Sequence, residues 1–233
     1  MPLQHGFTTS NRYFGFRVHT WNLPSGYTCP GALECLAFAN RATGKITNGK
    51  QQTFRCYSAT MERYPAVREK SWANFEAVRD KTADQVAATI AGALPERATH
   101  VRIHAGGDFF SQDYFDGWLN VASSFSAVKF WAFTKSLPFW LARRDQIPTN
   151  LCLQASYGGK HDDMIAANGL KFAKVVFTQQ EANVLNLRVD TDDALAMEGH
   201  QSFALLENSR RKTSTASSGA EQTTTLFTNA NGA

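Results

Sequence analysis

The sequence predicts an α/β fold in which parallel strands alternate with crossover helices. Short apolar segments alternate with helical patterns about five or six times along the chain, and Gly or Pro residues separate them. Such alternation favours a parallel sheet, because parallel strands can be joined only through a crossover. Polar residues recur where the predicted strands end, and barrels carry their sites at that edge. We therefore expect a partial TIM-barrel-like arrangement.

The first quarter of the chain predicts one strand followed by a long loop. Residues 13–21 alternate in character and predict the first strand. Residues 22–62 hold three of the four cysteines and turn signals at Gly44 and Asn48-Gly49, which predicts a cysteine-rich loop after that strand. Pro65 then begins a helix that runs to about residue 80. A second helix is expected over residues 83–94, because Pro95 stops it.

The remaining elements alternate regularly. Ser111 is expected to cap a helix that ends near residue 124, and Ser136 to cap a helix over residues 137–145. A short helix is expected near residues 192–198. The predicted strands cover residues 99–105, 128–134, 150–156, 174–178 and 203–206.

Composition limits the domain organisation and the partners. The chain of 233 residues is 43% hydrophobic, which suits one core. We expect a single α/β domain over residues 1–207 and a disordered Ser/Thr-rich tail over residues 208–233. The net charge of +4 permits contact with nucleic acid without arguing for it.

The chain also lacks the patterns of export and membrane insertion. It shows no signal-peptide pattern and no apolar run of about 18 residues. The expected compartment is therefore the reducing cytoplasm, where cysteines more often hold metals or do chemistry than form disulfides.

The cysteine spacing predicts a soft metal centre. Cys29, Cys35 and Cys56 follow the pattern C-x5-C-x20-C. Thiolates are soft ligands, and three of them can hold a four-iron iron–sulfur cluster while one iron stays free for another ligand. Zinc is an alternative that would need a fourth ligand, such as Cys152 or His19. Buried structural cysteines or disulfides are another alternative. Cys152 itself is expected to be a core residue, away from the other three.

Polar residues at strand ends predict a ligand pocket. Gly106 and Gly107 end one predicted strand and would let a ligand approach the backbone, and Asp108 could hold an amine or a hydroxyl group. Further polar side chains lie at or just after the ends of the next two predicted strands. With Asp108 they could line the opening of one pocket: Lys135, Gln154 and Ser156. The alternative is that Asp108 belongs to a plain turn before a helix.

Several stretches resemble a family of phage and prophage proteins known as the gene product 88 family. They are Asn-Leu-Pro-Ser-Gly-Tyr-Thr-Cys-Pro-Gly-Ala at 22–32, Phe-Arg-Cys-Tyr-Ser-Ala at 54–59, Arg-Ile-His-Ala-Gly-Gly-Asp-Phe at 102–109 and Phe-Thr-Lys-Ser at 133–136. They are spread over most of residues 20–160. The resemblance implies a phage origin, hence the host cell cytoplasm, and leaves the biochemical role undefined.

The order of motifs also resembles radical S-adenosylmethionine (SAM) enzymes at the level of the fold. Those enzymes have a three-cysteine loop after the first strand, and their second strand ends in Gly-Gly-Glu, which holds the amino group of SAM. Gly106, Gly107 and Asp108 match that motif with Asp in place of Glu. The cysteine spacing, x5 and x20, departs from the compact C-x3-C-x2-C of those enzymes.

The sequence thus predicts a phage-encoded iron–sulfur protein with a four-iron cluster on Cys29, Cys35 and Cys56. A radical-SAM-like enzyme would bind SAM or another small ligand at the free iron, beside Asp108 and the other strand-end residues. A non-enzymatic module, braced by a cluster or by zinc, would instead bind a host protein or nucleic acid. The sequence leaves open whether the chain is an enzyme.

Overall fold

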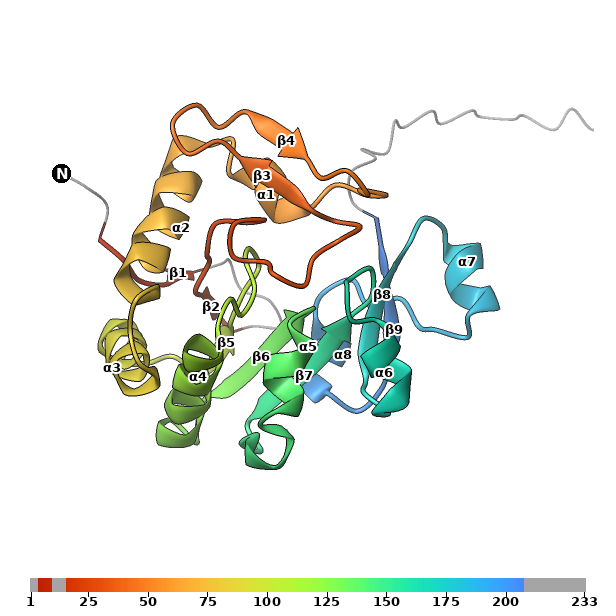
Figure 1. Ribbon diagram of the computed structural model, residues 1–233. Coiled ribbons are helices and arrows are strands. Elements are labelled where there is room, and N and C mark those ends of the chain that lie inside the picture. The colour runs from red at the N-terminus through yellow and green to blue at the C-terminus, as the bar shows by residue number, and fades with distance from the viewer. Residues whose placement is uncertain (1–3, 10–15, 208–233) are drawn as a thin grey trace, which may run out of the picture.

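A mostly parallel seven-stranded sheet forms the centre of the molecule (Figure 1). This computed structural model describes residues 4–9 and 16–207. The strands lie in the order β1-β2-β5-β6-β7-β8-β9, and only the β1–β2 pair is antiparallel. Their bounds are β1 Thr8–Thr9, β2 Val18–Thr20, β5 His100–Arg102, β6 Lys129–Thr134, β7 Leu151–Ser156, β8 Phe172–Val176 and β9 Phe203–Leu206.

From β5 to β9, each strand pairs with the strand of this sheet that precedes it in the sequence. Successive strands are therefore added at the same edge of the sheet. The helices are α1 Tyr57–Met61, α2 Pro65–Val78, α3 Ala83–Ala93, α4 Gln112–Ser124, α5 Leu137–Leu141, α6 Asp163–Ala167, α7 Gln179–Val184 and α8 Ala194–Glu198, and residues Arg144–Gln146 form a 3-10 turn. None of the described helices has the length and apolar character needed to span a bilayer.

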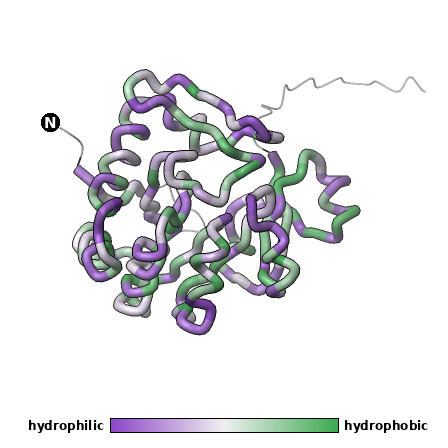
Figure 2. The backbone as a smooth tube through the Cα atoms, in the orientation of Figure 1, coloured by the Kyte–Doolittle hydropathy of each residue, from purple (hydrophilic) through white to green (hydrophobic). Residues whose placement is uncertain are grey.

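The sheet carries apolar side chains on both faces. The larger core joins Val101, Phe130 and Leu153 of the sheet to Trp118 of α4. On the other face Trp131 and Phe203 pack with Leu195 of α8. Figure 2 shows hydrophobic stretches in the central strands, whereas hydrophilic stretches are common in the surrounding helices and loops. Strands covered on both faces explain why these segments are nearly continuous apolar runs.

The sheet is open, with β1 and β9 as its edges. No closed barrel forms in the described residues, so the expectation of a barrel is supported only as far as a mixed α/β fold with a mostly parallel sheet.

The segment of residues 22–62 is more structured than the predicted loop. It contains a hairpin of β3 (Ala37–Ala39) and β4 (Ile46–Asn48), followed by α1. The hairpin is closed by a turn in which Asn40 N–H donates to Lys45 O at 2.8 Å. In Figure 1 this hairpin and α1 lie together at one end of the central sheet. These strands have three residues each, too few for hydrophobic periodicity to reveal them.

Most of the other predicted elements are confirmed with small shifts. Ser111 caps α4, because its Oγ accepts a hydrogen bond from Tyr114 N–H. Pro65 begins α2, and Thr82 opens α3 with a capping box. The strand expected at 174–178 lies at Phe172–Val176, since Thr178 instead caps α7 by accepting a hydrogen bond from Glu181 N–H. Two short helices, α6 and α7, were not predicted.

Two predicted segments lie partly or wholly outside the residues that the structure describes. The first strand, expected over 13–21, is described only as Val18–Thr20, since residues 10–15 are outside the described part. The expected tail at 208–233 also lies outside it.

Candidate metal centre and strand-end site

The three clustered cysteines come from three separate stretches of the chain. Cys29 lies in the turn after β2, where Gly26 N–H donates to its Sγ at 3.4 Å. Cys35 precedes the β3–β4 hairpin, and Cys56 is the residue before the first turn of α1. All three are free thiols and are only partly exposed. Because these cysteines are separated in the sequence, it is the folding of residues 22–62 that brings them near one another.

The electrostatics of the thiols show that they are neighbours. Burial raises the pKa of Cys29, and repulsion from Asp108, Cys56 and Cys35 raises it further. Burial also raises the pKa of Cys35 to about 11, while Lys135 lowers it and Cys56 raises it. Cys29 therefore feels the charge of both other cysteines and Cys35 that of Cys56, and Cys29 and Cys35 both feel Asp108.

Cys56 has a different local environment. Burial is the largest influence and raises the pKa of its thiol. Hydrogen bonding from the backbone N–H groups of Ala59 and Ser58, in the first turn of α1, acts in the opposite direction. Within the described residues, no three or more His, Cys, Asp and Glu side chains are arranged around a point where one metal ion could bind.

Glycines allow the cysteine segment, residues 22–62, to pack closely against the ends of the strands. Leu23 N–H donates to Gly106 O at 2.9 Å. A Cβ atom at Gly106 would overlap Ser58 Oγ of α1, and one at Gly31 would overlap the backbone carbonyl of Lys135. Gly107 has φ +85° and lies against Leu23 and Thr28. The chain itself thus fills the space beside Gly106 and Gly107 that the sequence assigned to a ligand, and their role toward a ligand stays a prediction.

Asp108 is a buried carboxylate with three hydrogen-bond donors. Its Oδ1 accepts from Phe109 N–H at 2.7 Å and from Thr134 Oγ at 2.6 Å, and its Oδ2 accepts from Lys135 N–H at 2.8 Å. Burial raises the pKa of Asp108, and these donors partly offset that rise. Asp108 therefore joins the end of β5 to the end of β6, in the irregular segment that precedes α4.

The ammonium group of Lys135 points toward the end of β7. Its Nζ donates to Ser156 O at 2.9 Å, to Ser156 Oγ at 2.8 Å and to Tyr157 O. Lys135 is buried as well. Two of the predicted site residues, Lys135 and Ser156, are thus in direct contact, and the expectation that they lie at one edge of the sheet is met geometrically.

Gln154 is the one predicted site residue whose polar atoms stay without protein partners. It lies on β7 opposite Phe133 of β6, two residues before Ser156, and is fully buried. Neither Oε1 nor Nε2 has a hydrogen-bond partner in the described structure. Buried amides are normally satisfied, so the absence of partners for these two atoms is unusual.

Glu62 is a member of this neighbourhood that sequence reasoning missed. Its Oε1 accepts from Ser25 N–H at 2.7 Å, while Oε2 has no partner. Burial raises the pKa of Glu62 to about 7, and its charge raises the pKa of Cys56. Nothing in the local sequence separates Glu62 from an exposed glutamate at the end of a short helix, so no sequence signal identifies it.

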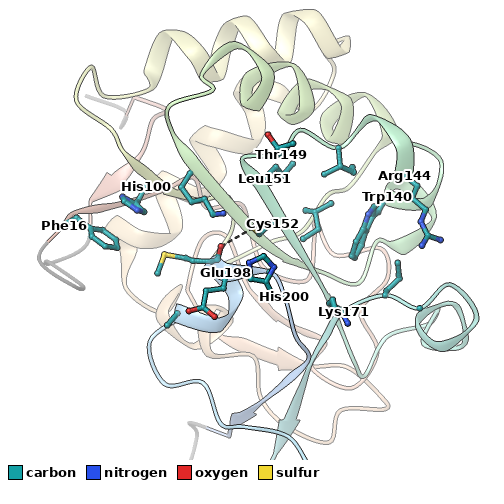
Figure 3. Close-up of a pocket in the computed structure, with 18 residues that line it drawn as sticks. Phe16, His100, Trp140, Arg144, Thr149, Leu151, Cys152, Lys171, Glu198 and His200 are labelled. Atoms are coloured by element: carbon teal, nitrogen blue, oxygen red, sulfur yellow. Dashed lines mark hydrogen bonds between the residues drawn. The ribbon is translucent and has the colours of Figure 1, made fainter.

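Cys152 lies at the other end of the strands. It lines a groove of about 1020 Å³ near the amino ends of β5, β6 and β7, and Figure 3 shows it with His100 and Glu198 around it. Its Sγ donates to Met197 O at 3.1 Å. The expectation that Cys152 stands apart from the other cysteines agrees with this position, although it lines a groove and is only half-buried.

Comparison with known proteins identifies one family. A family model described as gene product 88 matches residues 4–226. No curated protein and no solved structure matches the chain. The comparisons therefore give no support to the resemblance to radical SAM enzymes.

Proposed function

We propose that this chain, which belongs to the phage gene product 88 family, holds a four-iron iron–sulfur cluster on Cys29, Cys35 and Cys56. One observation carries the proposal: three free thiols come from three stretches of the chain, and Cys56 lies near enough to the other two to raise the pKa of both Cys29 and Cys35. Once deprotonated, three neighbouring thiolates could each bind a shared soft cofactor.

The donor set suits a cluster better than a single ion. A four-iron cluster binds each thiolate through a different iron, so its ligands stand farther apart than the ligands of one zinc ion. The described residues contain no set of His, Cys, Asp and Glu side chains gathered around one ion. The choice of a cluster over zinc therefore rests on the three-cysteine donor set, since zinc would need a fourth ligand.

Two features of the surroundings would favour an anionic cofactor, whereas the carboxylates of Asp108 and Glu62 would oppose it. Gly26 N–H already points at Cys29 Sγ, and N–H groups directed at sulfur are among the features that tune cluster potentials. The positive charge of Lys135 acts on Cys35. Since thiols bind metal as thiolates, loading would release the protons that burial now holds on these groups.

With three cysteine ligands, the cluster would supply one open coordination position and a one-electron couple to a small ligand such as SAM. Gln154 is the side chain best suited to such a ligand, because its donor and its acceptor are both free. Asp108 accepts a hydrogen bond from the backbone of Lys135, whose ammonium group donates to Ser156. These hydrogen bonds would fix the strand ends that form the pocket. In this reading the open sheet would serve as the partial barrel of a radical-SAM-like enzyme.

A second candidate function is a cluster that only braces the segment of residues 22–62, as in a binding module for a host protein or nucleic acid. The packing of Ser58 and Thr28 against Gly106 and Gly107 favours it, because a backbone already in contact with its own chain offers a ligand no close approach. Both candidates require the cluster and differ in whether a small ligand binds it.

The first experiment is iron and sulfide analysis, with an absorption spectrum, on protein purified without oxygen. We expect about four irons and four sulfides per chain. Alanine at Cys29, Cys35 or Cys56 should abolish them, while Cys152→Ala serves as the matched control and should retain them. A colourless protein, one zinc per chain, or loss of iron only in Cys152→Ala would refute the proposal.

The second experiment separates the two candidates. Calorimetric titration of the loaded protein with SAM should give binding that Gln154→Leu weakens if the cluster is an enzyme centre. Absence of binding to a fully loaded protein would leave the bracing role.

A further inference from the structure

Two exposed tyrosines lie on one side of the short helix α1 and the turn after it. Tyr57 and Tyr64 are each 62% exposed. Arg63 N–H donates to Thr60 O at 3.3 Å and Tyr64 N–H donates to Met61 O at 3.1 Å, so the helical path continues beyond α1. Residues seven apart on such a path share a face. The opposite face is buried through Ser58, Ala59 and Glu62, so both rings point outward.

Cationic residues without ion-pair partners among the described residues lie close to these tyrosines in the chain. Arg55 and Arg63 are exposed neighbours of the two tyrosines in the chain. Gly44 packs against the backbone of Arg63, which places the hairpin turn and exposed Lys45 beside it. Among the described residues none of these three cations forms an ion pair. Lys45, Arg55, Tyr57, Arg63 and Tyr64 together are called the basic–aromatic patch below.

The local charge balance is positive. Residues 33–64 contain five Lys or Arg and two Glu, and one of the two, Glu62, is fully buried. The surface that the hairpin and α1 present is therefore more basic than the mild net charge of the chain suggests. Surfaces that bind single-stranded nucleic acid combine aromatic rings, on which bases stack, with cationic side chains, which contact the phosphates. The tyrosines and unpaired cations of this surface supply both features.

We propose that the basic–aromatic patch binds single-stranded nucleic acid without sequence preference. Tyr57 and Tyr64 would each stack one base, and Lys45, Arg55 and Arg63 would contact the phosphates between and beside them. A protein partner could bury the same tyrosines, but three unpaired cations favour a polyanion. This proposal concerns the outer surface of the segment and does not depend on the chemistry at the cysteines.

The test is fluorescence anisotropy with labelled single-stranded DNA and RNA oligonucleotides on the full chain purified without oxygen. Tyr57→Ala and Tyr64→Ala should each weaken binding about tenfold, because each removes one stacking platform. Tyr57→Phe and Tyr64→Phe keep the ring and should bind as the wild type does. Whichever oligonucleotide binds more tightly identifies the natural class.

Salt dependence tests the cations. Arg63→Ala should reduce the slope of log K against log salt by about 0.7, the value for one phosphate contact on a single strand. Arg144→Ala is the matched control, because it removes the same charge from the groove at the other end of the strands. It should leave both affinity and slope unchanged. Iron and sulfide content, measured on every variant, keeps a failure of cluster loading distinct from a failure of this proposal.

Several results would overturn the proposal. They are absence of binding to either oligonucleotide, equal binding by the tyrosine-to-alanine variants, or an equal loss in Arg144→Ala. Arg210, Arg211 and Lys212 form a second basic run in the sequence. Loss of binding only when these three are replaced by Ala would assign the nucleic acid to that run and refute the patch.

Discussion

Asp108 and Lys135 are joined through the backbone of the lysine and not through its charge. Asp108 Oδ2 accepts from Lys135 N–H at 2.8 Å, while the ammonium group of Lys135 donates to Ser156 Oγ at 2.8 Å and to backbone carbonyls beyond it. The carboxylate of Asp108 thus links the ends of β5 and β6, whereas the ammonium group of Lys135 links the ends of β6 and β7. Together they tie the carboxyl ends of β5, β6 and β7 to one another beneath the cysteine segment.

Replacement of Asp108 by Asn tests this junction. An amide can accept at one atom only, and its NH₂ group would face the N–H of Lys135 or the hydroxyl of Thr134. We expect Asp108→Asn to lower the free energy of unfolding by about 1–3 kcal/mol, the cost of a buried donor left unsatisfied. Urea denaturation followed by circular dichroism measures it. A smaller loss in Thr134→Val is the matched comparison, and an unchanged midpoint in Asp108→Asn would contradict the role.

Gly106→Ala tests the contact between the strand end and α1. The added methyl would overlap Ser58 Oγ and lie 3.1 Å from Ser25 Oγ. Overpacking of this kind costs about 1–3 kcal/mol, and thermal unfolding should show the loss. The control is Gly92→Ala on α3, which meets no atom within 4 Å and should stabilise the helix by up to about 1 kcal/mol.

A second variant isolates the cause of that loss. Ser58→Ala removes the hydroxyl group in the way, so the double variant Gly106→Ala with Ser58→Ala should recover part of the stability. Identical losses in the single Gly106 variant and in the double variant would mean that Ser58 is not the obstacle.

His104 makes the stability depend on pH. Burial lowers the pKa of this imidazole to about 3, and its Nε2 lies 3.0 Å from Tyr114 OH. Below the unfolded value of about 6.5 only the unfolded chain binds this proton, so the stability due to His104 falls as the pH falls from about 6.5 toward 3. The loss at pH 5 relative to pH 7 is about 2 kcal/mol.

Comparison with a variant is needed because Glu62 acts in the opposite direction. Its raised pKa, about 7, means that the folded chain binds the extra proton, so its contribution falls as the pH rises from about 4.5 to 7. His104→Gln removes the imidazole alone. The difference in unfolding free energy between wild type and His104→Gln should shrink by about 2 kcal/mol from pH 7 to pH 5. A difference that does not change with pH would contradict a buried neutral His104.

Removal of the proposed cluster should loosen residues 22–62. The exposed basic residues Arg41, Lys45, Lys50 and Arg55 offer trypsin sites there. If Cys29, Cys35 and Cys56 hold the segment through iron, oxidation followed by iron chelation should speed cleavage at these sites, because local unfolding exposes them. Mass spectrometry of the fragments locates the cuts. The loaded Cys152→Ala variant should resist cleavage as the wild type does, and equal rates before and after iron removal would deny the cluster any bracing role.

The sequence predicted the parallel sheet because its signals are local. Residues 128–134 and 150–156 carry apolar runs, and Ser111 and Pro65 mark helix starts by backbone chemistry that a few neighbouring residues specify. The same local reasoning missed β3, β4 and α1, which are too short for periodicity to appear. Those elements exist through their packing on the strand ends, a contact between residues distant in the chain.

The candidate site divides in the same way. Residue type and spacing in the chain predict Cys29, Cys35 and Cys56 as ligands and set Cys152 apart, and the predicted strand ends suggest Asp108, Lys135 and Ser156 as pocket residues. Only the folded chain shows that burial raises the pKa of all three thiols, that Gly106 packs against Ser58, and that the side chain of Gln154 has no partner among the described residues. Burial and proximity between distant segments create these properties, since desolvation and charge interaction depend on distance in space and not on distance along the chain.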